Sequence, residues 1–140
     1  MFKFPYTKNG KGYTFALIPI ILENKEENIK SGYIAQIDSG AVFSVFHTDI
    51  ADTLGIDLKH IKKQVLFRGV GEQSKDFIGK PYIINLMVYQ KGISHKFESV
   101  IVFSDDINKD GYPLLGMGGF FNKFKKVIFD NERQKVILEP

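Results

Sequence analysis

A carboxylate and a glycine turn separate two apolar segments in the sequence Ile34-Ala35-Gln36-Ile37-Asp38-Ser39-Gly40-Ala41-Val42-Phe43-Ser44. Asp, Ser and Gly are common turn formers, so these three residues alone indicate an ordinary hairpin tip. The nearest flanking hydrophobic side chains are Ile34, Ile37, Val42 and Phe43. Because these flanks are apolar, they predict that Asp38 is enclosed by hydrophobic groups. A buried carboxylate is costly unless it is paired or protonated, so Asp38 is a candidate for a chemical role.

Hydrolysis of a peptide bond by carboxylates requires two of these groups, which share one proton across a water molecule. One carboxylate acts as general base on the water, and the protonated one polarises the carbonyl. The chain has one Asp-Ser-Gly and no second Asp-Ser-Gly or Asp-Thr-Gly. Asp38 of one chain therefore cannot form the pair, but a symmetric homodimer would bring two copies of Asp38 together at its two-fold axis.

Short apolar strands separated by Gly-containing turns recur along the chain and predict an all-β barrel or sandwich. The expected strands are Thr14–Leu22, Tyr33–Ile37, Val42–Phe46, Lys63–Arg68, Phe77–Gly79, Tyr82–Tyr89, Lys96–Phe103, Tyr112–Leu115, Val127–Asp130 and Lys135–Leu138. The polar residues 23–31 predict a hairpin loop, and Asn131-Glu132 predicts a turn between the last two strands. Pro19 indicates a strand edge or a bulge.

One short helix is expected over residues 48–54. Thr48 is the expected N-cap, and Gly55 is the expected C-terminal stop. The chain has 140 residues, which fits one domain of the usual size of about 100–150 residues. We therefore expect a single domain over residues 1–140.

Composition excludes several classes of function. The chain has no cysteine, which excludes disulfides, thiolate metal sites and cysteine nucleophiles. His47, His60 and His95 lack a metal-site spacing, and the net charge of +3 is scattered rather than gathered into a nucleic-acid-binding face. No apolar run approaches the length of a membrane span, and the N-terminus lacks the features of a signal peptide. A cytoplasmic location is the default expectation.

Four elements, in their order along the chain, resemble the retropepsin-like aspartic proteases, the single-domain family of the retroviral proteases and their prokaryotic relatives. The matching segments are Ala16-Leu17-Ile18-Pro19-Ile20, Asp38-Ser39-Gly40-Ala41, Phe67-Arg68-Gly69-Val70-Gly71 and Leu114-Leu115-Gly116. The tail, with Gly119-Phe120-Phe121 followed by two short apolar strands, also looks like the prokaryotic members. The resemblance implies a closed-barrel acid protease fold with one short helix and a flap hairpin.

The resemblance also implies roles for the matched residues. Asp38 would be the catalytic carboxylate in an active-site loop completed by Ser39, Gly40 and Ala41. Ser39 would hydrogen-bond across the dimer, and Gly40 would let the substrate backbone approach closely. The flap tip would comprise Gly69, Val70 and Gly71, and the element supporting the active site would comprise Leu114, Leu115 and Gly116.

The function implied is a homodimeric, metal-independent and cofactor-independent aspartic endopeptidase that holds an extended peptide or protein substrate as an added strand. The alternative is a dimerisation or peptide-binding module that keeps the fold without turnover. One departure stands out, because retroviral members carry an Arg–Asp pair where this chain has Met117 and Val42. Both halves of the pair are missing together, so a Met–Val contact is a possible replacement.

Two other motifs match their templates poorly. The run Gly116-Met117-Gly118-Gly119 suggests a phosphate-binding turn, but the segment after it is too short for the helix of a dinucleotide fold. The acidic run with Asp105, Asp106, Asn108 and Asp110 lacks the Gly and terminal Glu of an EF-hand, which favours a solvated loop.

Overall fold

The computed structural model describes residues 1–68 and 76–140. The three residues predicted as the flap tip, Gly69, Val70 and Gly71, lie outside the described residues. The strands on either side of them are β7 (Val65–Arg68) and β8 (Asp76–Gln90), which pair antiparallel from Val65 with Gly79 to Arg68 with Asp76.

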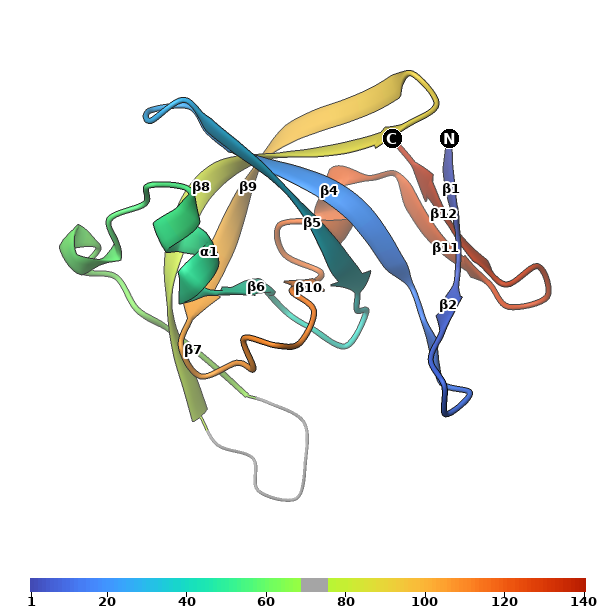
Figure 1. Cartoon of the computed structure of the whole chain (residues 1–140), viewed down its shortest axis with the longest axis horizontal. Helices are drawn as coiled ribbons and strands as arrows, with labels where there is room; N and C mark the ends of the chain where they lie inside the picture. Colours follow the sequence, from blue (N-terminus) through green and yellow to red (C-terminus); the bar gives the residue numbers. More distant parts are fainter. Residues whose placement is uncertain (69–75) are drawn as a thin grey trace.

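Six strands close into a barrel, which confirms the predicted all-β, closed-barrel fold class (Figure 1). The barrel strands are β4 (Leu17–Asn24), β5 (Ile29–Ile37), β6 (Ser44–His47), β8, β9 (Ile93–Ser104) and β10 (Leu114–Leu115). Their order around the barrel is β4-β5-β10-β6-β9-β8, and β8 pairs with β4 to complete the ring. The two-residue strand β10 lies between β5, to which it is parallel, and β6, to which it is antiparallel.

The loop predicted over residues 23–31 is wrong, because β4 and β5 pair as far as Asn24 with Ile29. Distant partners accommodate the polar residues in this ladder. Glu23 forms ion pairs with Lys30 and Lys96, and buried Asn24 donates a hydrogen bond of 2.8 Å to the Leu54 carbonyl. Only residues 25–28 form the turn.

Proline and glycine do not break β8, which had been expected as two strands. Residues 76–79 of β8 pair with β7, and residues 80–90 pair with β9. Gly79 lies at the change of partner, where an added Cβ would meet the Val102 side chain and would lie 3.0 Å from the Phe103 carbonyl oxygen. Gly79 is thus a close approach between strands rather than a strand end. Pro19 lies in the part of β4 that pairs with β5 alone, which agrees with its predicted edge position.

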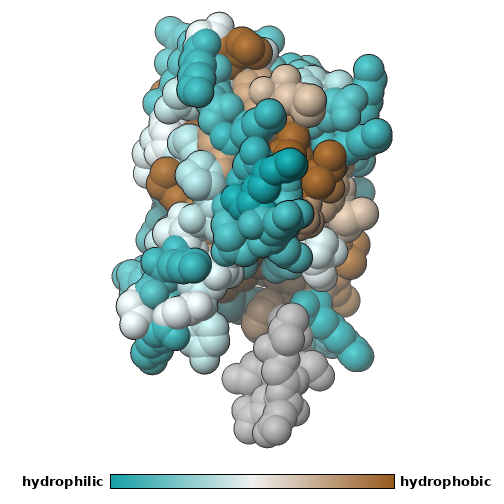
Figure 2. Space-filling model, turned by 90° about the vertical axis from the view of Figure 1, so that its right-hand side faces the viewer, coloured by the Kyte–Doolittle hydropathy of each residue, from teal (hydrophilic) through white to brown (hydrophobic). Residues whose placement is uncertain are grey.

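The two ends of the chain meet in a second sheet with the order β1-β12-β11. Its strands are β1 (Phe2–Pro5), β11 (Lys126–Asp130) and β12 (Lys135–Glu139). Strand β1 was not expected, although Phe2 and Phe4 alternate with exposed residues and are buried. The small pair β2 (Thr7–Lys8) and β3 (Thr14–Phe15) joins this sheet to the barrel (Figure 1). On the side of the molecule seen in Figure 2, hydrophobic side chains form separate patches among hydrophilic ones.

The predicted helix is present as α1 (Thr48–Thr53), but its cap is wrong. His47 rather than Thr48 is the N-cap, and its Nδ1 accepts a hydrogen bond of 3.0 Å from the Asp49 amide. Gly55 follows the helix with a φ of +70°, which confirms the predicted stop. Two single-turn 3-10 helices, η1 (Leu58–His60) and η2 (Phe121–Lys123), were not expected. In residues 1–68 and 76–140, no helix is long and apolar enough to cross a membrane.

Candidate active site

The end of β5 presents Asp38 to the surface of the barrel. The Asp38 amide donates to the Leu115 carbonyl at 2.9 Å, which extends the β5–β10 pairing by one residue. The chain then turns, the Ala41 amide donates to the Asp38 carbonyl at 3.2 Å, and the Gly40 amide donates to Asp38 Oδ1 at 2.9 Å. A Cβ on Gly40 would lie 3.3 Å from that oxygen, which is tighter than ordinary contact. Glycine therefore leaves room for the carboxylate.

The expectation that hydrophobic side chains enclose Asp38 is only partly correct, because some of these side chains are exposed. Ile37 is buried at 4% exposure, but Ile34 and Val42 are exposed, at 48% and 68%. Asp38 is half-buried, and the next two residues, Ser39 and Gly40, are exposed. In a single chain the turn therefore presents its carboxylate and its apolar flank to the outside.

A second segment, residues 116–119, lies directly against the loop after Asp38. The Met117 amide donates to the Ala41 carbonyl and the Gly118 amide donates to the Val42 carbonyl, both at 2.8 Å. A Cβ on Gly116 would lie 2.6 Å from the Ala41 carbonyl oxygen and closer still to that of Phe43. The two backbones approach so closely that only glycine fits at this position.

The residues that replace the retroviral Arg–Asp pair lie on these two segments. The Met117 amide bonds to Ala41, the neighbour of Val42, and the Val42 carbonyl accepts from Gly118, the neighbour of Met117. The side chains of Val42 and Met117 are 68% and 50% exposed. The contact between the two side chains stays a prediction. Because both residues are uncharged, the replacement leaves no charge unpaired.

Two serines fix residues 116–119, and the sequence analysis missed both. Ser44 Oγ donates to the Gly118 carbonyl at 2.9 Å and accepts from the buried Gly116 amide at 3.0 Å. Ser99 Oγ donates to the Gly119 carbonyl at 2.5 Å. Both serines are buried within apolar strands. Each hydroxyl in such a strand needs a partner, and that requirement was the available signal.

Replacing Ser44 with alanine is expected to destabilise the fold by about 1–3 kcal/mol, because the buried Gly116 amide loses its acceptor. The measurement is the free energy of unfolding from urea denaturation. Ser94→Ala, at an exposed position of β9, is the control and should change the stability by less than about 0.5 kcal/mol. Equal stabilities of the two variants would contradict the role of Ser44.

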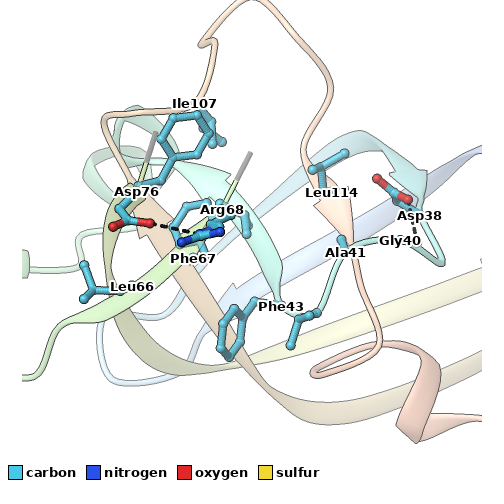
Figure 3. Close-up of a pocket in the computed structure, with 13 residues that line it drawn as sticks. Asp38, Gly40, Ala41, Phe43, Leu66, Phe67, Arg68, Asp76, Ile107 and Leu114 are labelled. Carbon is cyan, nitrogen blue, oxygen red and sulfur yellow. Dashed lines mark hydrogen bonds and ion pairs between the residues drawn. The ribbon is translucent and has the colours of Figure 1, made fainter. Parts of the chain in front are cut away.

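A cavity of about 450 Å³ begins at Asp38 and extends beneath the β7–β8 pair (Figure 3). Asp38 and Gly40 lie at one end, and the ion pair of Arg68 with Asp76 lies at the other. Most of the wall between them is apolar, and it comprises Ala41, Val42, Phe43, Val45, Leu66, Phe67, Phe77, Ile107 and Leu114. The cavity therefore combines an ionisable group with a hydrophobic surface, as binding sites for small molecules and peptides commonly do.

The β7–β8 pair contributes an aromatic contact and an ion pair to this cavity. Phe67 and Phe77 are cross-strand partners, and their rings pack edge to face with centroids 5.5 Å apart. At the next residue pair of the β7–β8 ladder, Arg68 Nε lies 3.4 Å from Asp76 Oδ1, and both side chains are largely exposed. The sequence resemblance included Phe67 and Arg68 but not their partners Phe77 and Asp76, because this pairing depends on the register between two strands.

The structure brings together the predicted active-site loop, residues 38–41, and the predicted supporting element, residues 114–116. Leu114 lines the cavity, Leu115 is buried beneath Asp38, and Gly116 contacts the loop after Asp38. In the acidic run that begins at Asp105, the Asp105 side chain accepts from the Thr48 hydroxyl, and Asp106 accepts from the Ile78 amide. The described part of the chain holds no group of three or more His, Cys, Asp or Glu side chains arranged for a metal ion.

Comparisons with known proteins place this architecture. No protein-family profile and no curated protein sequence matches the chain. Among solved structures, it is similar to a retropepsin-like aspartic protease from Rickettsia conorii, with a TM-score of 0.58 and 22% identity over 98% of this chain and 90% of that one. It is also similar to the retroviral protease-like domain of Ddi1 from Leishmania major, with a TM-score of 0.50 and 14% identity over 91% of this chain and 96% of that one.

The protein therefore has a retropepsin-like fold, which is an aspartic-protease type of fold. The closed barrel with one short helix that the sequence resemblance implied is confirmed, while the predicted flap tip lies outside the described residues.

Proposed function

We propose that residues 1–140 form one domain of a homodimeric aspartic endopeptidase, in which two Asp38 carboxylates, one from each chain, activate a water molecule. The observation that carries this proposal is the position of Asp38. The carboxylate is half-buried at the mouth of a largely apolar cavity, on a turn whose next two residues are exposed. A turn exposed in this way is available to a second copy.

The chemistry follows from two carboxylates that share one proton. The ionised one takes a proton from water as the oxygen attacks the peptide carbonyl carbon, and the protonated one donates a hydrogen bond to the carbonyl oxygen. Collapse of the tetrahedral intermediate breaks the C–N bond, and the amine leaves with a proton from a carboxyl group. Because one carboxylate must be ionised and the other protonated, the rate should depend on pH with a bell shape.

The test is cleavage of a diverse peptide pool between about pH 3 and 7, the range in which coupled carboxyl groups exchange protons. Cleavage that a transition-state-mimicking aspartic protease inhibitor blocks would support the proposal. A well-folded dimer that cleaves nothing at any pH would contradict it and favour the peptide-binding module. Cleavage by a protein that sediments only as a monomer would contradict the shared pair of carboxylates.

Ser39→Ala tests the proposed hydrogen bond across the dimer. Ser39 is exposed in the single chain, directly after Asp38. Two symmetric hydrogen bonds would be lost, so the dimer dissociation constant should rise about tenfold or more. Sedimentation equilibrium measures this change, and Ser94→Ala is a control. An unchanged dissociation constant for Ser39→Ala would contradict the bracing role.

A further inference from the structure

Strand β8 leaves the barrel at the point where its neighbour β9 ends. The β8–β9 ladder stops at Lys80 with Phe103, and β9 ends one residue later at Ser104. Beyond this point, residues 76–79 of β8 pair with β7 on their other edge. This part of β8 carries Phe77 and Asp76 to the cavity.

At Ile78, where β9 no longer pairs with β8, two side chains supply the hydrogen bonds of that edge. The Ile78 amide donates to Asp106 Oδ2 at 2.8 Å, and its carbonyl accepts from Ser104 Oγ at 2.6 Å. Ser104 Oγ also accepts from the Asp106 backbone amide at 3.1 Å, which holds the Ser104 side chain against the backbone of Asp106. The N–H and C=O of one strand residue point to the same edge, so both groups of Ile78 face away from β7. Ser104 and Asp106 thus complete the ladder on that edge.

The position of Phe77 depends on this edge. Phe77 directly precedes Ile78, lines the cavity and packs edge to face on Phe67. Without the bonds to Ser104 and Asp106, residues 76–78 would be held by β7 alone, and β7 has only four residues. The next side-chain hydrogen bond that anchors β8 is made by Lys80, whose Nζ donates to the Leu58 carbonyl at 2.9 Å.

We propose that Ser104 and Asp106 are positioning residues, which hold the β7–β8 pair over the cavity that begins at Asp38. Their effect on peptide binding rests on the proposed function, since it requires that the cavity holds the peptide. Their effect on the geometry of β8 does not. A carboxylate accepts a somewhat stronger hydrogen bond than a neutral group, so only part of the bond to Ile78 depends on the charge of Asp106. Asn at this position would keep an acceptor of the same shape.

The experiment measures amide hydrogen exchange of the full chain by NMR. In Asp106→Ala, the Ile78 amide should exchange about fivefold faster, as expected for the loss of one ordinary hydrogen bond. Asp106→Asn should restore most of the protection, and Ser104→Ala should weaken the Phe67–Phe77 ring contact. Asp110→Ala, an exposed aspartate in the same loop, is the control. The amide of Leu86, within the β8–β9 ladder, should be unchanged in all variants.

A second readout addresses peptide binding. With a peptide from the pool that the wild type cleaves, Asp106→Ala should raise KM more than it lowers kcat, and Asp106→Asn should reverse most of the rise in KM. Failure of the wild type to cleave would contradict the proposed function, while the exchange result would still stand on its own. Unchanged Ile78 exchange in Asp106→Ala would overturn the proposal. Faster exchange at Ile78 and Leu86 alike would also overturn it, because that result indicates general destabilisation.

Discussion

Asp38→Asn should abolish peptide cleavage and leave the fold intact. The substituted amide side chain would retain an oxygen that can accept from the Gly40 amide, so the turn keeps its internal bond. What it loses is the ability to take or give a proton. General acid–base groups contribute about 10²–10⁴-fold to a rate, and both subunits change together, so activity should fall at least about 10²-fold. The measurement is the initial rate on the best peptide of the pool.

A matched control is Asp110→Asn, which removes one carboxylate from an exposed loop position and should retain full activity. Subunit mixing tests the shared pair directly. When wild type and Asp38→Asn are mixed in equal amounts and exchange freely, the activity per wild-type chain should fall to about half, because half of those chains pair with an inactive partner. Undiminished activity per wild-type chain, or cleavage by Asp38→Asn itself, would contradict the mechanism.

The sequence predicted the parts of the fold that depend on short-range chemistry. Asp38-Ser39-Gly40 and Leu114-Leu115-Gly116 each follow or include an apolar strand and end in a glycine, and the structure places them side by side. The all-β class followed from short apolar segments separated by Gly-containing turns. These signals are local, so they can be read without knowing which strands pair.

The errors come from contacts between distant residues. Glu23 and Asn24 read as loop because they are polar, yet Lys96 and the Leu54 carbonyl supply their partners. Gly79 was predicted to end a strand because glycine often does so. In the structure β8 continues through Gly79, whose backbone lies close to the Val102 side chain. In both cases a long-range partner overrides the local preference, and no local pattern reveals that partner.

The centre of the candidate site could be predicted from the sequence, but the residue contacts that form its opposite wall could not. Asp38 could be selected from the sequence, because a carboxylate between apolar strands requires an explanation. The opposite wall, with Phe67 and Phe77, depends on the register of a strand pair whose connection is seven residues long, 69–75. Asp106 was predicted to lie in a solvated loop and Ser104 was not singled out, and only their bonds to Ile78 reveal another role.

Gly116→Ala should strongly destabilise the protein, because it adds a methyl group where two backbone segments of the candidate site meet. The added Cβ would lie 2.6 Å from the Ala41 carbonyl oxygen and 2.7 Å from the Phe43 carbonyl carbon, and both are backbone atoms. No side-chain rotation relieves such a contact, so the loop after Asp38 must move away from residues 116–119. Overpacking of this kind costs about 3 kcal/mol or more, which is a large part of the stability of an ordinary domain.

Two further glycines make this prediction quantitative. A Cβ on Gly118 would lie 3.0 Å from the Val42 carbonyl oxygen, and a Cβ on Gly10 would have no neighbour within 4 Å. Urea denaturation followed by far-ultraviolet circular dichroism should therefore rank the alanine variants with Gly116 least stable, Gly118 intermediate and Gly10 close to the wild type. If Gly116→Ala were as stable as Gly10→Ala, the two segments could not be packed as closely as described. The loop that carries Asp38 would then lack the rigid support that a shared carboxylate pair needs, because the two carboxyl groups must meet across a single water molecule.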